Sequence, residues 1–311
     1  MKARKFFPTC IGLFLISSLV GCGSPSAAGI TPAATPPPAT PTAEEATATL
    51  PPPTSTPKPI HPELSMLATE KRAASTSKGP VLYSVPGMEA VRVANVVYSY
   101  DLSMDLYYPP GFDFSSPAPA VVFVNGLPDS KWKSLYGSIL KDTERIISWA
   151  QLAAASGMIA ITYETSSYVS TDTKDAMGFI LKEGEWLGVD VERLCLFGAS
   201  SNAPQALFLL YDDAGAYQQG LRCVVIHYGE VKFGALPKNV ALLVVEAGID
   251  DLNTNANLEK LVARAREEGI QVEHILYADG VHGFEVTDDS QESMRILERT
   301  LEFMLTNLAG P

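Results

Sequence analysis

Cysteine and histidine are scarce in this chain of 311 residues, which contains four of each. Cys195 and Cys223 lie inside apolar runs (RLCLF and RCVVI), and neither has other potential ligands around it at metal-binding spacing. We therefore expect no metal site. Free cysteine is among the most buried residue types, so we expect buried free thiols here, although a compartment outside the cytoplasm would permit a disulfide.

Positive charge is also scarce, with 23 Lys and Arg against 35 Asp and Glu and a formal charge of −12. Lys2, Arg4 and Lys5 account for three of these positive charges. The chain from residue 22 onward therefore has 20 Lys and Arg against 35 Asp and Glu, a formal charge of −15. A surplus of negative charge of this size argues against a nucleic-acid partner.

The first 22 residues read MKARKFFPTCIGLFLISSLVGC, a positive start followed by an apolar stretch over 11–20. This stretch is too short to span a bilayer comfortably. Its end, Leu19-Val20-Gly21-Cys22, resembles the lipobox of bacterial lipoproteins. The resemblance implies a signal peptide over residues 1–21 and lipidation of Cys22, where several acyl chains would anchor the protein to a membrane of the cell envelope. An ordinary secretory signal with a chance cysteine is the alternative.

A proline-rich segment comes next. Residues 23–62 hold 12 of the 23 prolines, interleaved with Thr, Ala and Ser. This composition cannot bury a core, and proline-rich linkers are extended and semi-rigid. We expect residues 22–79, with the lipidated Cys22 at their start, to be a tether, and residues 80–311 to form one domain.

Within residues 80–311, apolar runs alternate with segments of helical period. Residues 91–99 and 102–108 alternate apolar and polar side chains and predict an antiparallel pair at a sheet edge. Continuous apolar runs, typical of strands buried on both faces, follow at 120–125, 158–163, 193–197, 223–228, 241–247 and 272–278. Helices are predicted over 146–155, 171–186, 203–211, 258–268 and 290–308. This order predicts an α/β fold with a mostly parallel sheet and helices on both faces.

In such sheets, chemistry is found where the strands end. FGASSNA follows one apolar run with Ser200 and Ser201, AGIDD follows another with Asp250 and Asp251, and DGVHGF follows the last with His282. A serine hydroxyl needs a base to become a nucleophile, and His282 lies in a glycine-flanked loop.

The other polar candidates in the domain are better explained as structural. His227 and His274 lie within apolar runs. Asp279 precedes His282 by only three residues, and we interpret it as part of the loop structure.

The motifs LSMDLYYP, FGASSNA and VHGFE, with Ser, Asp and His in this order at strand ends, resemble the α/β-hydrolase family, and especially its dienelactone-hydrolase-like and small esterase members. The resemblance covers nearly all of residues 80–311. It implies a Ser-His-Asp triad with no metal or organic cofactor. Gly198 and the family pattern favour Ser200 as the nucleophile over Ser201, while Asn202 stands where the family usually has glycine.

Two roles in the triad and its surroundings depend on this resemblance. A G-x-x-D spacing favours Asp251 as the acid, whereas the pattern AGIDDLNTN, similar to esterases with an A-G-x-D loop, favours Asp250, which we prefer. The oxyanion hole should use the N–H of Ser201 and a second N–H from the turn at Gly126 and Leu127, with Leu127 as the expected donor.

The family often inserts a cap domain before the acid strand, but here only the short segment GEVKFGALPKNV is present. We therefore expect no large cap and an open, shallow cleft suited to short or accessible esters. Trp132, in the loop LPDSKWKSLYG, is expected either at this cleft or in helix packing. The predicted function is that of a carboxylesterase. The alternatives are a peptidase or acyltransferase with the same triad, or a non-catalytic binding lipoprotein.

Overall fold

The computed structural model describes residues 58–67, 79–211 and 215–310. The predicted signal peptide, Cys22 and most of the predicted tether lie outside these residues. In the part that is described, no helix combines the length and the apolar character needed to cross a membrane.

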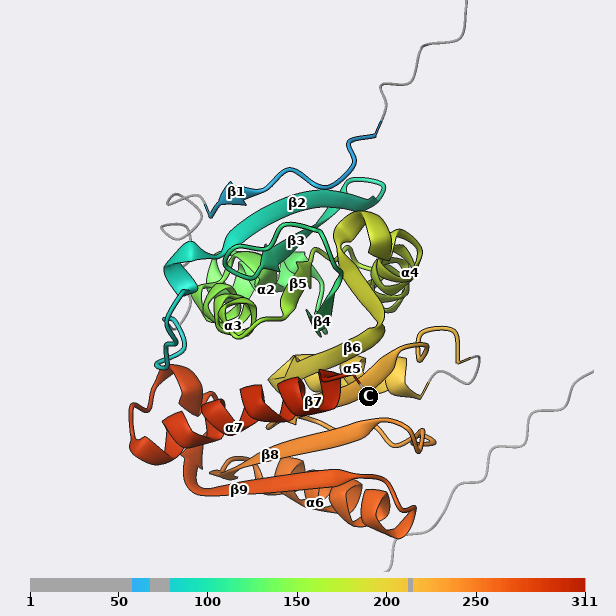
Figure 1. The fold of residues 1–311 in the computed structure, drawn as a ribbon. Helices are drawn as coiled ribbons and strands as arrows, with labels where there is room; N and C mark the ends of the chain where they lie inside the picture. Colours follow the sequence, from blue (N-terminus) through green and yellow to red (C-terminus); the bar gives the residue numbers. More distant parts are fainter. Residues whose placement is uncertain (1–57, 68–78, 212–214, 311) are drawn as a thin grey trace, which may run out of the picture. The chain divides into compact units, whose positions relative to one another are not determined.

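A sheet of nine strands forms the centre of the domain (Figure 1). The strands are β1 (Ser65–Met66), β2 (Arg92–Ser99), β3 (Leu102–Tyr108), β4 (Ala118–Phe123), β5 (Ile159–Tyr163), β6 (Val189–Ala199), β7 (Leu221–His227), β8 (Ala241–Ile249) and β9 (Val272–Val281). Their spatial order is β1-β2-β3-β5-β4-β6-β7-β8-β9. The pairs β1–β2, β2–β3 and β3–β5 are antiparallel, and all pairs from β5–β4 onward are parallel. The prediction of a mostly parallel sheet is confirmed.

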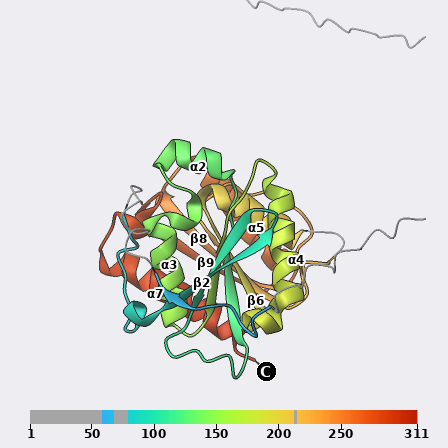
Figure 2. The ribbon, with the colours of Figure 1, turned by 90° about the horizontal axis from the view of Figure 1, so that it is seen from above.

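Helices cover both faces of this sheet, as predicted (Figure 2). They are α2 (Asp129–Tyr136), α3 (Glu144–Ala155), α4 (Val169–Leu187), α5 (Ala203–Leu210), α6 (Leu252–Glu267) and α7 (Gln291–Leu308), with 3₁₀ turns at Met88–Ala90, Leu140–Asp142, Ser200–Asn202 and Phe284–Val286. Helices α4, α5 and α6 pack on one face, and α3 and α7 pack on the other. Because both faces are covered, the central strands consist of continuous apolar runs.

Helix α2 differs from the prediction, which placed a loop after the first buried strand. The helix runs from Asp129 to Tyr136 and ends at Gly137, whose φ of +76° closes the last turn. Only Asp129 and Trp132 of its residues are buried. A helix of this length with so little buried surface has no recognisable apolar period, which is why the sequence pattern missed it.

The connection between β7 and β8 is short, as predicted. Residues 228–240 contain no helix, so no separate cap domain lies at this position. The carboxyl ends of the parallel strands are therefore not covered by an inserted domain here.

The prediction of two free thiols is wrong. Strands β6 and β7 are parallel neighbours in which Cys195 stands opposite Cys223, with their Cα atoms 4.7 Å apart, and the structure joins the two residues in a disulfide. Both cysteines are fully buried, as expected. Their pairing follows from the register of two strands, which their spacing in the sequence does not reveal.

Residues 58–67, within the predicted tether, pack on the domain. Strand β1 adds to the edge of the sheet by pairing with β2. The ring of His61 stacks on Phe114 with centroids 4.3 Å apart, and the indole Nε1 of Trp186 donates a hydrogen bond of 2.9 Å to the carbonyl of Pro59. Trp186 precedes β6, so these contacts lie at the end of the sheet where that strand begins.

Candidate active site

Ser200 lies directly after β6, on the sharp turn that leads into α5. Its φ of +57° falls in the left-handed region, which non-glycine residues rarely adopt. Strained backbone of this kind occurs at the nucleophile of strand–turn–helix elbows. The Ser200 N–H donates to the carbonyl of Tyr228 at 2.7 Å, which ties the turn to the end of β7.

Close packing around the turn explains the glycine before it. A Cβ on Gly198 would lie 2.9 Å from the Cβ of Ala206 and 2.9 Å from the carbonyl oxygen of Asn202. Strand β6 and helix α5 could not approach each other this closely with a larger residue at position 198.

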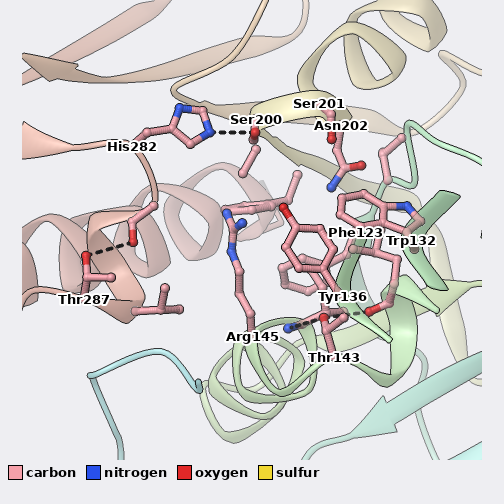
Figure 3. Close-up of a pocket in the computed structure, with 17 residues that line it drawn as sticks. Phe123, Trp132, Tyr136, Thr143, Arg145, Ser200, Ser201, Asn202, His282 and Thr287 are labelled. Carbon is pink, nitrogen blue, oxygen red and sulfur yellow. Dashed lines mark hydrogen bonds between the residues drawn. The ribbon is translucent and has the colours of Figure 1, made fainter. Parts of the chain in front are cut away.

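Three predicted site residues meet at the carboxyl ends of β6, β8 and β9. The Oγ of Ser200 lies 2.7 Å from Nε2 of His282 (Figure 3), and Nδ1 of His282 lies 2.7 Å from Oδ2 of Asp250. The imidazole is 43 % exposed, whereas the Asp250 side chain is 10 % exposed. With the proton on Nδ1 held by Asp250, Nε2 is free to accept the proton of the serine hydroxyl.

The neighbouring aspartate has a different environment. The carboxylate of Asp251 accepts hydrogen bonds from the backbone N–H groups of Asn253 (3.0 Å) and Thr254 (3.1 Å) at the start of α6. Aspartate in this position caps a helix N-terminus. Since α6 begins at Leu252, Asp251 occupies the cap position, while the side chain of Asp250 reaches His282.

The remaining histidines lie away from this arrangement. His227 is fully buried with Nε2 3.0 Å from the hydroxyl of Thr300, and His274 Nε2 lies 2.9 Å from Glu246. Asp279 is exposed on β9. Over the ranges that the structure describes, no group of three His, Cys, Asp or Glu side chains could hold a metal ion.

Burial of His227 leads to a prediction about acid stability. Burial lowers the pKa of His227 from 6.5 to about 4. Between these values the unfolded chain takes up a proton that the folded protein does not, so the free energy of unfolding should fall as the pH drops from 6.5 to 4, by about 3 kcal/mol. Urea denaturation at several pH values measures this slope. His227→Gln should remove this contribution, and an unchanged slope in the variant would contradict the assignment.

The predicted oxyanion donors belong to Ser201, which follows Ser200, and to the turn at Gly126 and Leu127, in which Gly126 contacts the backbone of Ser201. Within the described part of the chain, the N–H of Ser201 has no hydrogen-bond acceptor. The N–H of Gly126 donates to Oδ1 of Asn202 at 2.8 Å, and the N–H of Leu127 makes a longer contact of 3.3 Å with Oδ1 of Asn125. The Gly126 N–H is therefore already engaged, and the Leu127 N–H is the donor for which a substrate oxygen can more readily compete.

Gly126 contributes through its lack of a side chain. A Cβ at this position would lie 2.1 Å from the carbonyl oxygen of Ser201 and 2.7 Å from the Cα of Asn202. The two turns are thus in direct backbone contact. Asn202, which stands where the family that the sequence resembles usually has glycine, is buried, and its side chain bridges this contact.

The structure gives a role to the side chain of Asn125, the first residue of the turn Asn125-Gly126-Leu127, which the sequence alone did not assign. Its side chain is fully buried and accepts a hydrogen bond of 2.8 Å from Nε1 of Trp132, while its Nδ2 donates to the hydroxyl of Thr165 at 3.0 Å. These bonds fix the turn before Leu127 and attach α2 to it. The available signal was the position of Asn125 at the end of the run 120–125, where the turn begins.

Ser200 opens into a pocket of about 360 Å³ (Figure 3). Most of the residues that line the pocket are apolar or aromatic. They include Phe123, Trp132, Tyr136, Leu140, Ile146, Phe197 and Val286. This volume is within the range of small-molecule pockets. Helix α2 and the start of α3 form one of its walls.

A buried polar cluster lies behind His282. Nη2 of Arg145 lies 2.7 Å from the hydroxyl of Tyr228 and 2.6 Å from a carboxylate oxygen of Glu285, and the Tyr228 hydroxyl also donates to that carboxylate. Burial alone would raise the pKa of Glu285, but the charge of Arg145 and the hydrogen bond from Tyr228 hold it below its usual value. The Tyr228 ring packs edge-to-face on His282, with centroids 4.7 Å apart.

Comparison with known proteins identifies the fold. No family model matches the sequence, and no curated protein matches it. Among solved structures, the chain is similar to an esterase (LipW) from Mycobacterium marinum (TM-score 0.60, 15 % identity, 78 % of this chain and 87 % of that one). It is also similar to an α/β-hydrolase enzyme from a deep-sea metagenome library (0.56, 15 %, 70 % and 98 %) and to a bacterial heroin esterase (0.55, 13 %, 74 % and 88 %). The chain has the α/β-hydrolase fold.

Proposed function

We propose that the protein is a serine hydrolase, a carboxylesterase that works through an acyl-enzyme. The observation that carries this proposal is the pair of 2.7 Å contacts that links Asp250 to His282 and His282 to Ser200, with Ser200 held in a left-handed conformation. The esterases among the structural neighbours support it at the level of the fold.

Acylation begins with attack of the Ser200 Oγ on the ester carbonyl carbon, while Nε2 of His282 takes the hydroxyl proton. The carbonyl electron pair moves onto oxygen, and the N–H groups of Ser201 and Leu127 stabilise the charge that develops there. The intermediate then collapses, the bond to the leaving alkoxide breaks, and His282 gives its proton to that oxygen, which releases an alcohol.

Deacylation repeats these steps with water. His282 takes a proton from the water as its oxygen attacks the acyl carbon. The bond to Ser200 Oγ then breaks, and the proton returns to that oxygen, so that a carboxylic acid leaves and the enzyme is restored. Asp250 remains ionised throughout and holds the imidazole in the required tautomer.

Two finer parts of the proposal come from sequence motifs. LSMDLYYP, FGASSNA and VHGFE support a dienelactone-hydrolase-like or small esterase type. The lipobox-like end at Cys22, with the proline-rich segment after it, supports a lipid-anchored protein on the outer side of a cell-envelope membrane. Residues 1–57 are outside the described part of the chain.

Labelling with a fluorophosphonate tests the proposal. We expect one adduct, located by peptide mass spectrometry on Ser200, and we expect no adduct in His282→Ala because the hydroxyl then lacks its base. An adduct on Ser201 would move the nucleophile by one residue. A folded protein without any adduct would refute the hydrolase and favour the non-catalytic binding lipoprotein. An adduct together with amide cleavage or acyl transfer in place of ester hydrolysis would favour the peptidase or acyltransferase.

A further inference from the structure

One charged side chain in the pocket has no part in the proposed reaction. Of the 17 described residues that line the pocket, Arg145 is the only one with a permanent charge. Figure 3 shows its side chain rising from α3 toward the side of the pocket where Ser200 and His282 lie. Apart from the turn around Ser200, the neighbouring walls are largely apolar.

The position of Arg145 is not explained by the stability of its helix. Helix α3 begins at Glu144, so Arg145 lies in the first turn. A positive charge there opposes the helix dipole, which favours negative charge at the N-terminus. A reason for arginine at this position must therefore come from what its side chain contacts.

The guanidinium is held in a fixed orientation. Both of its described polar contacts, with the Tyr228 hydroxyl and with Glu285, use Nη2. The Arg145 side chain is 23 % exposed, whereas Glu285 is completely buried behind it. Arginine has five N–H donors, and the two contacts leave the Nη1 amino group without an acceptor among the described residues. A donor that is already oriented loses little entropy when a ligand binds.

We propose that Arg145 is a specificity-determining residue that donates a hydrogen bond to an oxygen on the acyl group of the substrate. The favoured substrates are esters whose acyl chain has an apolar body and carries a carboxylate or carbonyl oxygen beyond the ester carbon. The apolar walls take the body of the chain, and the weak screening between them strengthens the contact with the guanidinium. This inference rests on the proposed esterase activity.

A panel of p-nitrophenyl esters tests the inference. It contains butanoate and hexanoate, the half-esters of succinate and adipate, and the methyl-capped diesters of the same two acids. The measured quantity is the ratio of kcat/KM for each oxygen-bearing ester to kcat/KM for the alkyl ester of equal chain length. This ratio does not depend on the fraction of active protein. We expect at least one ratio to exceed about ten in the wild type. Preference for half-esters alone identifies a carboxylate, and equal preference for the diesters identifies any oxygen acceptor.

The variants separate specificity from structure. Removing Arg145 alone would leave a buried carboxylate unpaired, so the main variant is the double change Arg145→Met with Glu285→Gln, which we expect to bring the ratio close to one. Glu285→Gln alone frees the guanidinium from its internal partner and should raise the ratio for half-esters. If the double variant does not fold, the single variants Glu285→Gln and Arg145→Lys test the specificity role. This role requires Glu285→Gln to raise the ratio and Arg145→Lys to lower it.

Two results would overturn the inference. A wild-type ratio near one, or a ratio that is the same in the wild type and all variants, means that Arg145 only supports the structure, while the esterase activity itself stands. Absence of both ester hydrolysis and fluorophosphonate labelling in the folded wild type would refute the proposed function, and the specificity role with it.

Discussion

Replacing Ser200 with alanine should lower kcat for ester hydrolysis by about 10⁶-fold, because no acyl-enzyme can form without the Oγ atom. Loss of the nucleophile in a serine hydrolase has an effect of this order. The rate that remains should come from the oxyanion donors and from binding alone. Hydrolysis of p-nitrophenyl butyrate by purified variant and wild type measures the change, and circular dichroism shows whether the fold is retained.

Ser201→Ala is the matched control for this experiment. Ser201 is expected to act through its backbone N–H, which alanine keeps. The kcat should therefore stay within about tenfold of the wild type, a smaller loss than removal of one oxyanion donor causes. An inactive Ser201→Ala beside an active Ser200→Ala would reverse the roles of the two serines and contradict the 2.7 Å contact between Ser200 and His282 as the basis of catalysis.

Asp250→Asn should lower kcat by about 10⁴-fold with little change in structure. Asparagine can donate its amide to Nδ1 of His282, which then carries no proton, so the proton moves to Nε2 and this atom cannot accept one from Ser200. The comparison is Asp251→Asn, in which the new side chain caps α6 about as well as aspartate does. We expect its kcat to lie within about twofold of the wild type, since Asp251 contacts the helix and not His282.

The pair of variants gives a clear decision on the acid. A large loss of kcat in Asp251→Asn, with an active Asp250→Asn, would assign the acid to Asp251. Equal losses in both would mean that the loop between β8 and α6 acts as a unit, and that the contact of 2.7 Å between Asp250 and His282 does not by itself define the acid.

The sequence allowed the fold to be predicted where the signal was local. Each buried strand is a continuous apolar run, and the carboxyl ends of parallel strands meet at one edge, so Ser200, Asp250 and His282 could be placed close together without knowing the strand order. Helix α2 could not be predicted in this way. With only Asp129 and Trp132 buried, it lacks the apolar repeat by which a helix is recognised.

Contacts between distant segments depend on information that no local pattern contains. The Cys195–Cys223 disulfide requires β6 and β7 to be neighbours in a particular register. The hydrogen bond from Gly126 to Asn202 joins residues 76 positions apart. The choice between Asp250 and Asp251 depends on the residue at which α6 begins, and helix boundaries are the least reliable part of a prediction from sequence.

The packing of residues 58–67 has a consequence for access to the pocket. Lys58 pairs with Glu183 near the start of β6, whereas Ser200 follows the other end of this strand. Residues 58–67 therefore attach to the end of the sheet opposite the pocket, and none of them lines it. This segment does not obstruct the approach of a ligand to Ser200.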